Sequence, residues 1–354
     1  MRVLVALSGG VDSSVAAALL VEDGHEVVGA TMKLWGGASD TGCCSVGDVE
    51  DARRCAAQLG IDHHVFNYSA EFDQHVVEPY VADHAAGRTP NPCVECNRHL
   101  KFDVLLERAE LLGFDAVATG HHARIVERVD GTRRIARGAD EEKDQSYVLY
   151  TLRGRELDRV LFPIGELTKA EVRELAAARG LRTADKPESQ DLCFITRAEG
   201  RAAFLAERIE MHPGRVVDQA GVPMGTVEAV ELVTVGQRRG LHLAGGGARR
   251  FVTDVDVEGR TVTVGPPEAL RSRGLELHRM VWADVAPRAG RPLAVDAQVS
   301  AHGLPEPASA TVGLDGEVAL RWLEPQRKVA PGQSVVLYEG DEVLGGGIVV
   351  DPRR

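Results

Sequence analysis

Residues 6–14 read Ala6-Leu7-Ser8-Gly9-Gly10-Val11-Asp12-Ser13-Ser14 and join an apolar run to a helical pattern. The two glycines permit a tight turn that points backbone N–H groups at an anion. Ser13 and Ser14 fall at the start of the helix, where unpaired amides and the helix dipole favour phosphate. The segment therefore predicts a phosphate-binding turn, although a serine-capped glycine turn without a ligand shares part of the pattern.

Strand and helix patterns alternate after this turn. We expect strands over 3–7, 26–32, 64–68 and 115–119, and helices over 13–20, 49–59, 100–112 and 169–179. The last helix is entered through Thr168 with Glu171 three residues on, which is a capping-box pattern. Strands separated by helices of this length indicate a parallel sheet that is covered on both faces.

The pattern changes beyond about residue 201. Short alternating runs over 261–264, 310–312 and 334–338 are separated by Gly and Pro, which is typical of small β-barrels and sheets. Pro266-Pro267 predicts a division within this half. We therefore expect an α/β domain over 1–200, a central β-rich domain over 201–275 and a C-terminal β-barrel over 276–354.

Composition limits the class of protein. The 354 residues are 44% hydrophobic and 27% charged, which suits a globular protein of two or three domains. No run is long enough to cross a bilayer, and the N-terminal apolar stretch is too short for a signal peptide, so we expect a cytoplasmic protein without membrane contact. The net charge of −12 argues against a general polyanion binder but leaves room for a selective RNA enzyme.

The chain has six cysteines, all within the first 193 residues: Cys43, Cys44, Cys55, Cys93, Cys96 and Cys193. This clustering favours thiol chemistry or metal binding over a disulfide scaffold. Cys55 fits a buried helix face, whereas the Cys43–Cys44 pair suits either local packing or a redox or metal role. Two prolines two residues apart predict a shaped loop that carries Cys93 and Cys96, with a helix from about residue 100.

The stretch Ser-Gly-Gly-Val-Asp-Ser resembles the pyrophosphatase loop of the PP-loop family of ATP-dependent adenylating enzymes. A Walker lysine and a GxGxxG motif are both missing here. The resemblance implies a Rossmann-like domain of the adenine nucleotide alpha hydrolase type, transfer of AMP to a substrate oxygen, and Mg²⁺ held with the help of Asp12. The ATP-binding residues that it implies are Ala6, Leu7, Ser8, Gly9, Gly10, Val11, Asp12, Ser13, Met32 and Gly120.

Four further motifs follow in order. They are Gly-Arg-Thr-Pro-Asn-Pro-Cys-Val-Glu-Cys-Asn over 87–97, Gly120-His121-His122, Lys143-Asp144-Gln145-Ser146-Tyr147, and Asp191-Leu192-Cys193-Phe194. With the first loop, they make most of the chain resemble the bacterial tRNA-specific 2-thiouridylases. The resemblance implies thiolation of the wobble uridine in the tRNAs for lysine, glutamate and glutamine, with sulfur supplied by a cysteine desulfurase or a sulfur-relay protein.

The same resemblance implies roles for individual residues. Cys193 would carry sulfur as a persulfide, and Cys96 would resolve it by forming a disulfide. Asn91, Pro92 and Cys93 would line the pocket for the extruded base. Contacts with tRNA are implied for His121, Lys143, Asp144, Gln145 and Gln333, with the Gln237-Arg238-Arg239-Gly240 segment gripping the backbone. The basic residues Arg133, Arg134 and Arg137 suit phosphate positioning or a solvated charged loop.

Two features depart from the family pattern. Cys93 stands where members with one cysteine in this loop often have aspartate, so Cys93, Cys96 and Cys193 could instead hold a [4Fe–4S] cluster with one iron open to sulfide. Residues 299–303 lack the usual Arg-Tyr-Arg pattern, which leaves the grip on tRNA there open. A different PP-loop adenylating enzyme, acting on a small molecule, is the alternative function.

Overall fold

The computed structural model describes residues 1–35, 46–187, 192–195, 200–243 and 249–350. The Cys43–Cys44 pair and residues 189–191 lie outside the described residues, so nothing tests what was expected of them. Among the described residues, no helix is both long enough and apolar enough to cross a membrane.

The N-terminal half is built on a five-stranded parallel sheet with the order β3-β2-β1-β4-β7. Its strands are β1 (Arg2–Ala6), β2 (Glu26–Lys33), β3 (Asp62–Asn67), β4 (Ala116–Ala118) and β7 (Val160–Leu161). Four of these strands were expected from the sequence, and β7 was not. The α/β class is confirmed.

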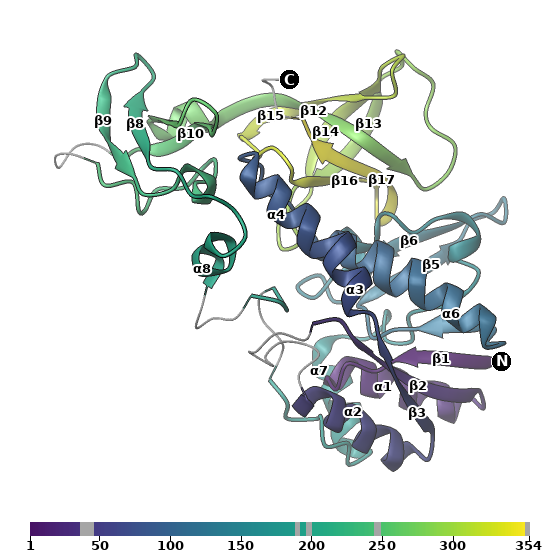
Figure 1. The fold of residues 1–354 in the computed structure, drawn as a ribbon. Coiled ribbons are helices and arrows are strands. Elements are labelled where there is room, and N and C mark those ends of the chain that lie inside the picture. Colours follow the sequence, from purple (N-terminus) through teal and green to yellow (C-terminus); the bar gives the residue numbers. More distant parts are fainter. Residues whose placement is uncertain (36–45, 188–191, 196–199, 244–248, 351–354) are drawn as a thin grey trace.

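Helices cover both faces of this sheet (Figure 1). One face carries α1 (Val11–Glu22), α2 (Val46–Leu59) and α7 (Lys169–Ala178), and the other carries α6 (Leu105–Leu111). Successive residues of β1 serve opposite faces, because Val3 packs in the cluster of α1 and α2 whereas Leu4 packs in that of α6. The capping box of α7 is confirmed, since Thr168 and Glu171 bond reciprocally.

The helix expected from residue 100 begins earlier. Residues Pro92–Glu95 form α5, a π-helix follows over Cys96–Val104 (η2), and α6 then continues. The expectation of a loop around both cysteines is therefore wrong. Pro92 occupies the first helical position, where its missing N–H costs nothing, and Asn91 caps the helix by accepting from the Cys93 amide at 3.1 Å.

A second helical run precedes this segment. It comprises α3 (Ser69–Phe72), a π-helix over Asp73–Val77 (η1) and α4 (Glu78–Ala85). In Figure 1 α4 extends from the N-terminal half toward the C-terminal strands. Its buried Tyr80 belongs to the main hydrophobic core of the N-terminal half.

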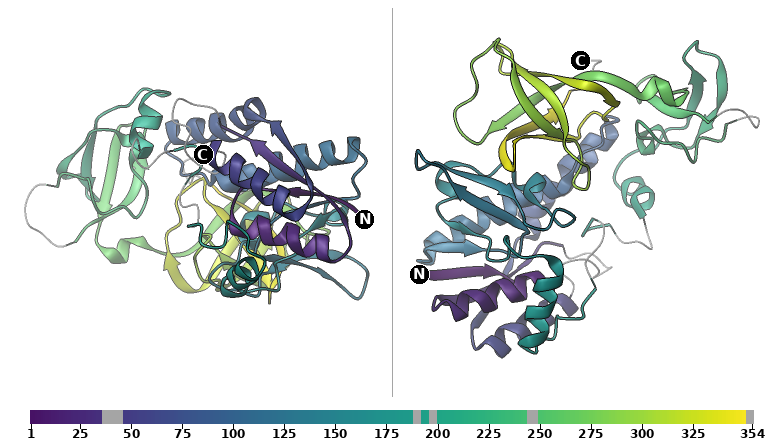
Figure 2. Two further views of the ribbon diagram at one scale, coloured as in Figure 1. Left: turned by 90° about the horizontal axis from the view of Figure 1, so that it is seen from below. Right: turned by 180° about the vertical axis from the view of Figure 1, so that it is seen from behind.

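The central region forms a separate small sheet. After α8 (Gly200–Ala206), the strands β8 (Gly214–Asp218), β9 (Pro223–Val227), β10 (Phe251–Asp256) and β11 (Thr261–Gly265) pair in the order β10-β11-β8-β9. This sheet encloses its own core and projects to one side of the molecule in both views of Figure 2. The predicted Gln237–Gly240 segment lies here, with Arg238 and Arg239 exposed.

The C-terminal strands close into a barrel. They are β12 (Arg271–Trp282), β13 (Leu293–Gln298), β14 (Glu306–Val312), β15 (Val318–Arg327), β16 (Ser334–Glu339) and β17 (Glu342–Val349). Neighbours pair in the order β12-β15-β14-β13-β16-β17, and β17 pairs again with β12. The expected β-rich second half is confirmed, whereas the domain limits at residues 200 and 275 remain our proposal.

An unexpected hairpin joins the barrel to the N-terminal domain. Strands β5 (Ala123–Glu127) and β6 (Arg133–Arg137) extend the barrel sheet through β17. Arg134 donates to Asp284 at 2.8 Å, so its charge is used within the protein. Arg137 donates to Asp144 at 2.9 Å and to Gln298 at 2.8 Å, and stacks on Tyr338 at 3.8 Å. Arg134 and Arg137 therefore make contacts within the protein at this junction, and a role of the basic stretch in phosphate positioning stays a prediction.

The motif over 143–147 lies at the same junction. The buried Asp144 carboxylate accepts from the amides of Gly138 and Ser146 at 3.0 Å, in addition to Arg137. The Tyr147 hydroxyl donates to the Ser334 carbonyl at 2.8 Å. Asp144 is thus occupied by internal hydrogen bonds, and this environment favours a structural role over the expected contact with tRNA.

We predict that Arg137→Met destabilises the protein. The substitution leaves a buried carboxylate without its cation, which costs about 3–5 kcal/mol of unfolding free energy. Arg133→Met is the matched control on the same strand, because Arg133 is half-exposed and each of its two ion pairs, with Glu127 and Asp158, is worth at most about 1 kcal/mol. Urea unfolding of both variants measures the difference, and equal losses would contradict the role given to Arg137.

Candidate active site

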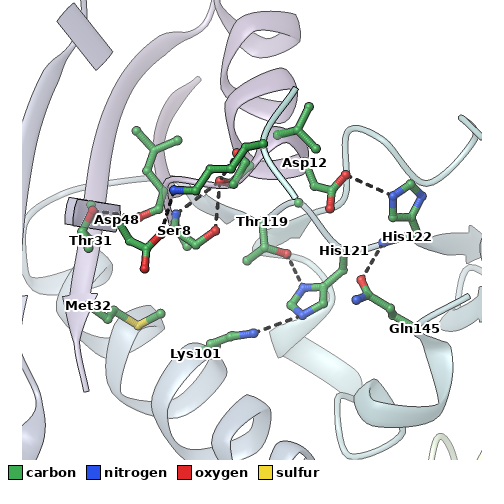
Figure 3. A pocket seen from close by; sticks show the side chains of 18 of the residues that line it. Ser8, Asp12, Thr31, Met32, Asp48, Lys101, Thr119, His121, His122 and Gln145 are labelled. Carbon is green, nitrogen blue, oxygen red and sulfur yellow. Dashed lines mark hydrogen bonds and ion pairs between the residues drawn. The ribbon is translucent and has the colours of Figure 1, made fainter. Parts of the chain in front are cut away.

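A cavity of about 350 Å³ opens at the carboxyl ends of β1, β2 and β4 (Figure 3). It lies where the sheet order reverses around β1, the usual ligand position in open α/β sheets. Of the ten expected ATP-binding residues, nine line it: Ala6, Leu7, Ser8, Gly10, Val11, Asp12, Ser13, Met32 and Gly120. The cavity also takes in His121, Lys143 and Gln145 from the expected tRNA set. The structure therefore brings these two sets of residues together.

Glycine is required at two places around the cavity, one in its wall and one beside it. Gly9 has a φ of +73°, and a Cβ there would lie 2.3 Å from the Asp48 carbonyl oxygen. A Cβ on Gly120 would lie 2.5 Å from the Ser13 amide nitrogen. The turn, the start of α2 and the end of β4 thus approach too closely for any side chain.

The N-terminus of α1 faces the cavity without a side-chain cap. Gly10 is the N-cap residue and has no side chain to bond the first amides. Ser13 and Ser14 instead return their hydroxyls to the Gly10 carbonyl, at 3.2 and 2.8 Å. Twelve helical residues point their dipole at this spot, so the site suits an anionic group such as phosphate.

Two lysines flank the turn, and the sequence had not indicated either. Lys169 Nζ lies 2.7 Å from both carboxylate oxygens of Asp12. Lys186 Nζ lies 2.7 Å from Asp48 and from Asp51. Both lysines line the cavity. They come from more than 130 residues away along the chain, so no local motif connects them to a turn that has no lysine of its own.

Asp12 is a charged carboxylate in the cavity. Burial alone would raise its pKa, but hydrogen bonds from His122 and Lys169, together with their charges, hold the pKa below its usual range. The His122 Nε2 atom lies 3.3 Å from Asp12. Asp12 and Asp48 supply the hard oxygen ligands that Mg²⁺ prefers. Since no group of three such side chains converges among the described residues, Mg²⁺ there would need phosphate oxygens as further ligands.

His121 is buried at the end of β4 and bonds on both ring nitrogens (Figure 3). Its Nδ1 lies 2.6 Å from Thr119 Oγ1, and its Nε2 lies 3.3 Å from Lys101 Nζ. Burial, reinforced by the charge of Lys101, holds the pKa of His121 well below its usual range, so the ring is neutral. Because a lysine ammonium only donates, Nε2 accepts and the proton is on Nδ1.

The two expected catalytic cysteines share one hydrophobic core. Cys96, at the start of η2, and Cys193 are both partly buried and pack against the main core cluster. The neighbouring Phe194 is held by the rings of Phe72, Tyr80 and Phe204, with centroids 5.3–5.6 Å away. This aromatic packing anchors the residue that follows Cys193.

Cys93 is exposed on α5 and differs from the other two in its surroundings. Among the described residues, no three His, Cys, Asp or Glu side chains converge closely enough to hold a metal. Cys93, Cys96 and Cys193 therefore do not form the ligand set of an iron–sulfur cluster in this conformation.

The expected base-contacting residues Asn91 and Pro92 line a second, smaller cavity of about 150 Å³. Its walls come from the catalytic domain and from barrel residues that include Arg279 and Ser334. Gln333, expected to contact tRNA, donates its side-chain amide to the Thr89 carbonyl. The barrel therefore holds the segment that leads to Cys93 and Cys96.

Family models match the chain in three consecutive parts. Residues 1–197 match the model described as "tRNA methyl transferase HUP domain", residues 202–266 the one described as "tRNA methyl transferase PRC-barrel domain", and residues 272–349 the one described as "Aminomethyltransferase beta-barrel domain".

Close relatives match over nearly their whole length. The chain is 48% identical to the tRNA-specific 2-thiouridylase MnmA of Chloroflexus aurantiacus, over 99% of each chain. It is 46% identical to the protein of the same name from Geobacter metallireducens, over 98% of this chain and 96% of the relative. The relative from Renibacterium salmoninarum is also 46% identical, over 98% of this chain and 95% of its own.

Solved structures give a more distant likeness. A 4-thiouridine synthetase in complex with RNA and ATP matches with a TM-score of 0.39 and 20% identity, over 55% of this chain and 44% of that chain. The U34-tRNA thiolase NcsA from Methanococcus maripaludis, with its [4Fe–4S] cluster, matches with a TM-score of 0.36 and 17% identity, over 58% and 63%. Likeness at this level is too low to indicate shared chemistry.

We predict that Gly9→Ala disrupts the turn. The positive φ and the Asp48 carbonyl both oppose a Cβ, so the unfolding free energy should fall by about 1–3 kcal/mol and ATP binding should be lost. Gly10→Ala is the control, because its φ is −92° and its Cβ would meet only Ser8 Oγ, at 3.4 Å. Urea unfolding and calorimetric titration with ATP measure both effects. A Gly9→Ala protein as stable as Gly10→Ala would refute the steric argument.

Proposed function

Because this chain belongs to the tRNA-specific 2-thiouridylase family, we propose that it uses ATP to replace the 2-oxygen of a tRNA uridine with sulfur. One observation carries the proposal: the segments that bear Cys96 and Cys193 pack on the same core as strands that form the nucleotide cavity. A phosphate-binding turn and a pair of thiols are what activation followed by sulfur transfer requires.

The first step activates the base. The uridine O2 attacks the α-phosphorus of ATP, the bond to the β-phosphate bridging oxygen breaks, and pyrophosphate leaves. The amides at the start of α1 and the ammonium groups of Lys169 and Lys186 are placed to stabilise the departing charge. Mg²⁺ bound near Asp12 would neutralise part of the phosphate charge. The product is an O2-adenylated uridine, whose AMP group is a good leaving group.

The second step transfers sulfur. A persulfide on Cys193 attacks C2 with its terminal sulfur, the C2–O bond breaks, and AMP departs with the electron pair. The Cys96 thiolate then attacks the Cys193 sulfur, which leaves the transferred sulfur on C2 and forms a Cys96–Cys193 disulfide. A thiol reductant must reopen this disulfide before the next turnover, and a persulfide donor must reload Cys193.

The finer assignments rest on the family resemblance. The target is the wobble uridine of the tRNAs for lysine, glutamate and glutamine, and the donor is a cysteine desulfurase or its relay protein. Asn91, Pro92 and Cys93 would contact the base, and His121, Lys143, Gln145 and Gln333 would contact tRNA. We place the reaction in the cytoplasm, where the tRNA is found. The division at residues 200 and 275 gives one catalytic domain and two β-rich domains.

A mechanism based on an iron–sulfur cluster is the alternative for the sulfur-transfer step. It would use Cys93, Cys96 and Cys193 as ligands of a [4Fe–4S] cluster, and the exposed Cys93 is the residue that raises this possibility. Since the three thiols do not converge among the described residues, no step is derived through a cluster. A small-molecule adenylating enzyme is the other alternative, and it explains neither cysteine segment.

We predict that ATP turnover depends on tRNA. Incubation with a tRNA transcript and ATP should release AMP and pyrophosphate, because the uridine oxygen is the nucleophile. Without tRNA, pyrophosphate release should be absent. ADP as the product, or release that does not require RNA, would rule out the thiouridylase proposal.

Cys93→Ala separates the two sulfur mechanisms. We predict that the variant forms 2-thiouridine at a rate close to that of the unsubstituted protein when a persulfide donor is supplied. In the persulfide mechanism Cys93 neither carries the transferred sulfur nor forms the disulfide. Cys193→Ser is the matched comparison and should abolish the product. Iron and acid-labile sulfide are measured after anaerobic purification. Stoichiometric iron together with an inactive Cys93→Ala would establish the cluster in place of the persulfide.

A further inference from the structure

Lys101 is the side chain that connects the cysteine-bearing helix to the nucleotide cavity. It lies in η2, five residues after Cys96, and it lines the cavity. In a π-helix the backbone hydrogen bonds link residues five apart, so Lys101 lies little more than one turn after Cys96 along the helix. In an α-helix of 3.6 residues per turn, the two would diverge. The π-helix that begins at Cys96 therefore also supplies a cation to the cavity wall.

The partner of Lys101 differs from the partners of Lys169 and Lys186. Lys169 and Lys186 are each held by aspartates at 2.7 Å. Lys101 Nζ instead donates to the neutral ring of His121 at 3.3 Å. A neutral acceptor fixes the ammonium without cancelling its charge, so the field of Lys101 remains available to a substrate anion.

The position of Lys101 in the cavity indicates at which step of the reaction it would act. Figure 3 shows Lys101 below the cavity, across from Ser8 and Asp12 of the phosphate-binding turn. The dipole of α1, together with Lys169 and Lys186, would stabilise the pyrophosphate as it leaves. Lys101 comes from the same helix as Cys96, so it is the cavity lysine that belongs to a cysteine-bearing segment.

We propose that Lys101 is a catalytic residue of the displacement step, which donates a hydrogen bond to the oxygen that leaves C2 with AMP. The inference rests on the proposed function. As the C2–S bond forms, the C2–O electron pair moves onto the AMP oxygen, and Lys101 stabilises this charge without giving up its proton. His121 is the positioning residue that holds the ammonium in place through its Nε2 lone pair.

The test compares Lys101→Met with Lys101→Arg, and uses Lys33→Met as the control because Lys33 is exposed at the end of β2. Full-length protein, a tRNA transcript, ATP and a persulfide donor are mixed for a single turnover. In Lys101→Met, AMP release and 2-thiouridine formation should both slow by about 10²–10³-fold, the usual cost of losing one such donor. Pyrophosphate release should stay unchanged, so adenylated tRNA accumulates. Lys101→Arg keeps the charge and should recover part of the rate.

A second readout reports whether Lys101 holds its position. The charge of Lys101 lowers the pKa of His121, so the imidazole pKa should rise in Lys101→Met and not in Lys33→Met, as followed by NMR. Normal AMP release in Lys101→Met would overturn the proposal, as would pyrophosphate release slowed as much as thiolation. Failure of the proposed function itself looks different, because the unsubstituted protein would then make no 2-thiouridine.

Discussion

The close approach of three backbone segments at the start of α1 is the constraint on which the site depends. The phosphate-binding turn, the first turn of α2 and the end of β4 meet where a single Cβ would lie within 2.3–2.5 Å of backbone atoms. Only glycine at positions 9 and 120 allows this contact. The contact leaves the first amides of α1 open to an anion, and it brings His121, which follows Gly120, into the same cavity.

Electrostatic balance in the cavity follows from that geometry. The turn has no lysine, and two lysines from distant parts of the chain stand beside it, each held by aspartates that also line or flank the cavity. Such pairs keep cations near the phosphate position without leaving them unpaired in a partly buried site. Arrival of a nucleotide would offer these lysines new anionic partners at small cost, since their positions are already set.

The barrel is joined to the N-terminal domain on two sides. The β5–β6 hairpin of the catalytic domain extends the barrel sheet, and Arg137 links Asp144 to Gln298 and Tyr338 across the junction. On the other side, Pro331 and Gln333 bond the backbone of Thr89, shortly before the cysteine-bearing helices. The barrel therefore fixes the segment on which sulfur chemistry would occur. Asp144, Ser146 and Tyr147 of the motif over 143–147 are held in this packing, whereas Lys143 and Gln145 line the nucleotide cavity.

The sequence by itself determined the parallel sheet, the phosphate-binding turn, the capping box at Thr168 and the β-rich second half. These features follow from local periodicity and from residues such as glycine, whose conformational freedom is visible in one segment. The tertiary structure alone decided that Asp144 faces Arg137, that Lys169 and Lys186 reach the turn, and that η2 begins at Cys96 and carries Lys101 into the cavity. The lysine contacts join residues far apart in the chain, the Asp144–Arg137 contact depends on how the hairpin packs on the barrel, and η2 is a helix type with no local signature. Burial and charge in the folded state determine these contacts, and the spacing of residues in the sequence does not predict them.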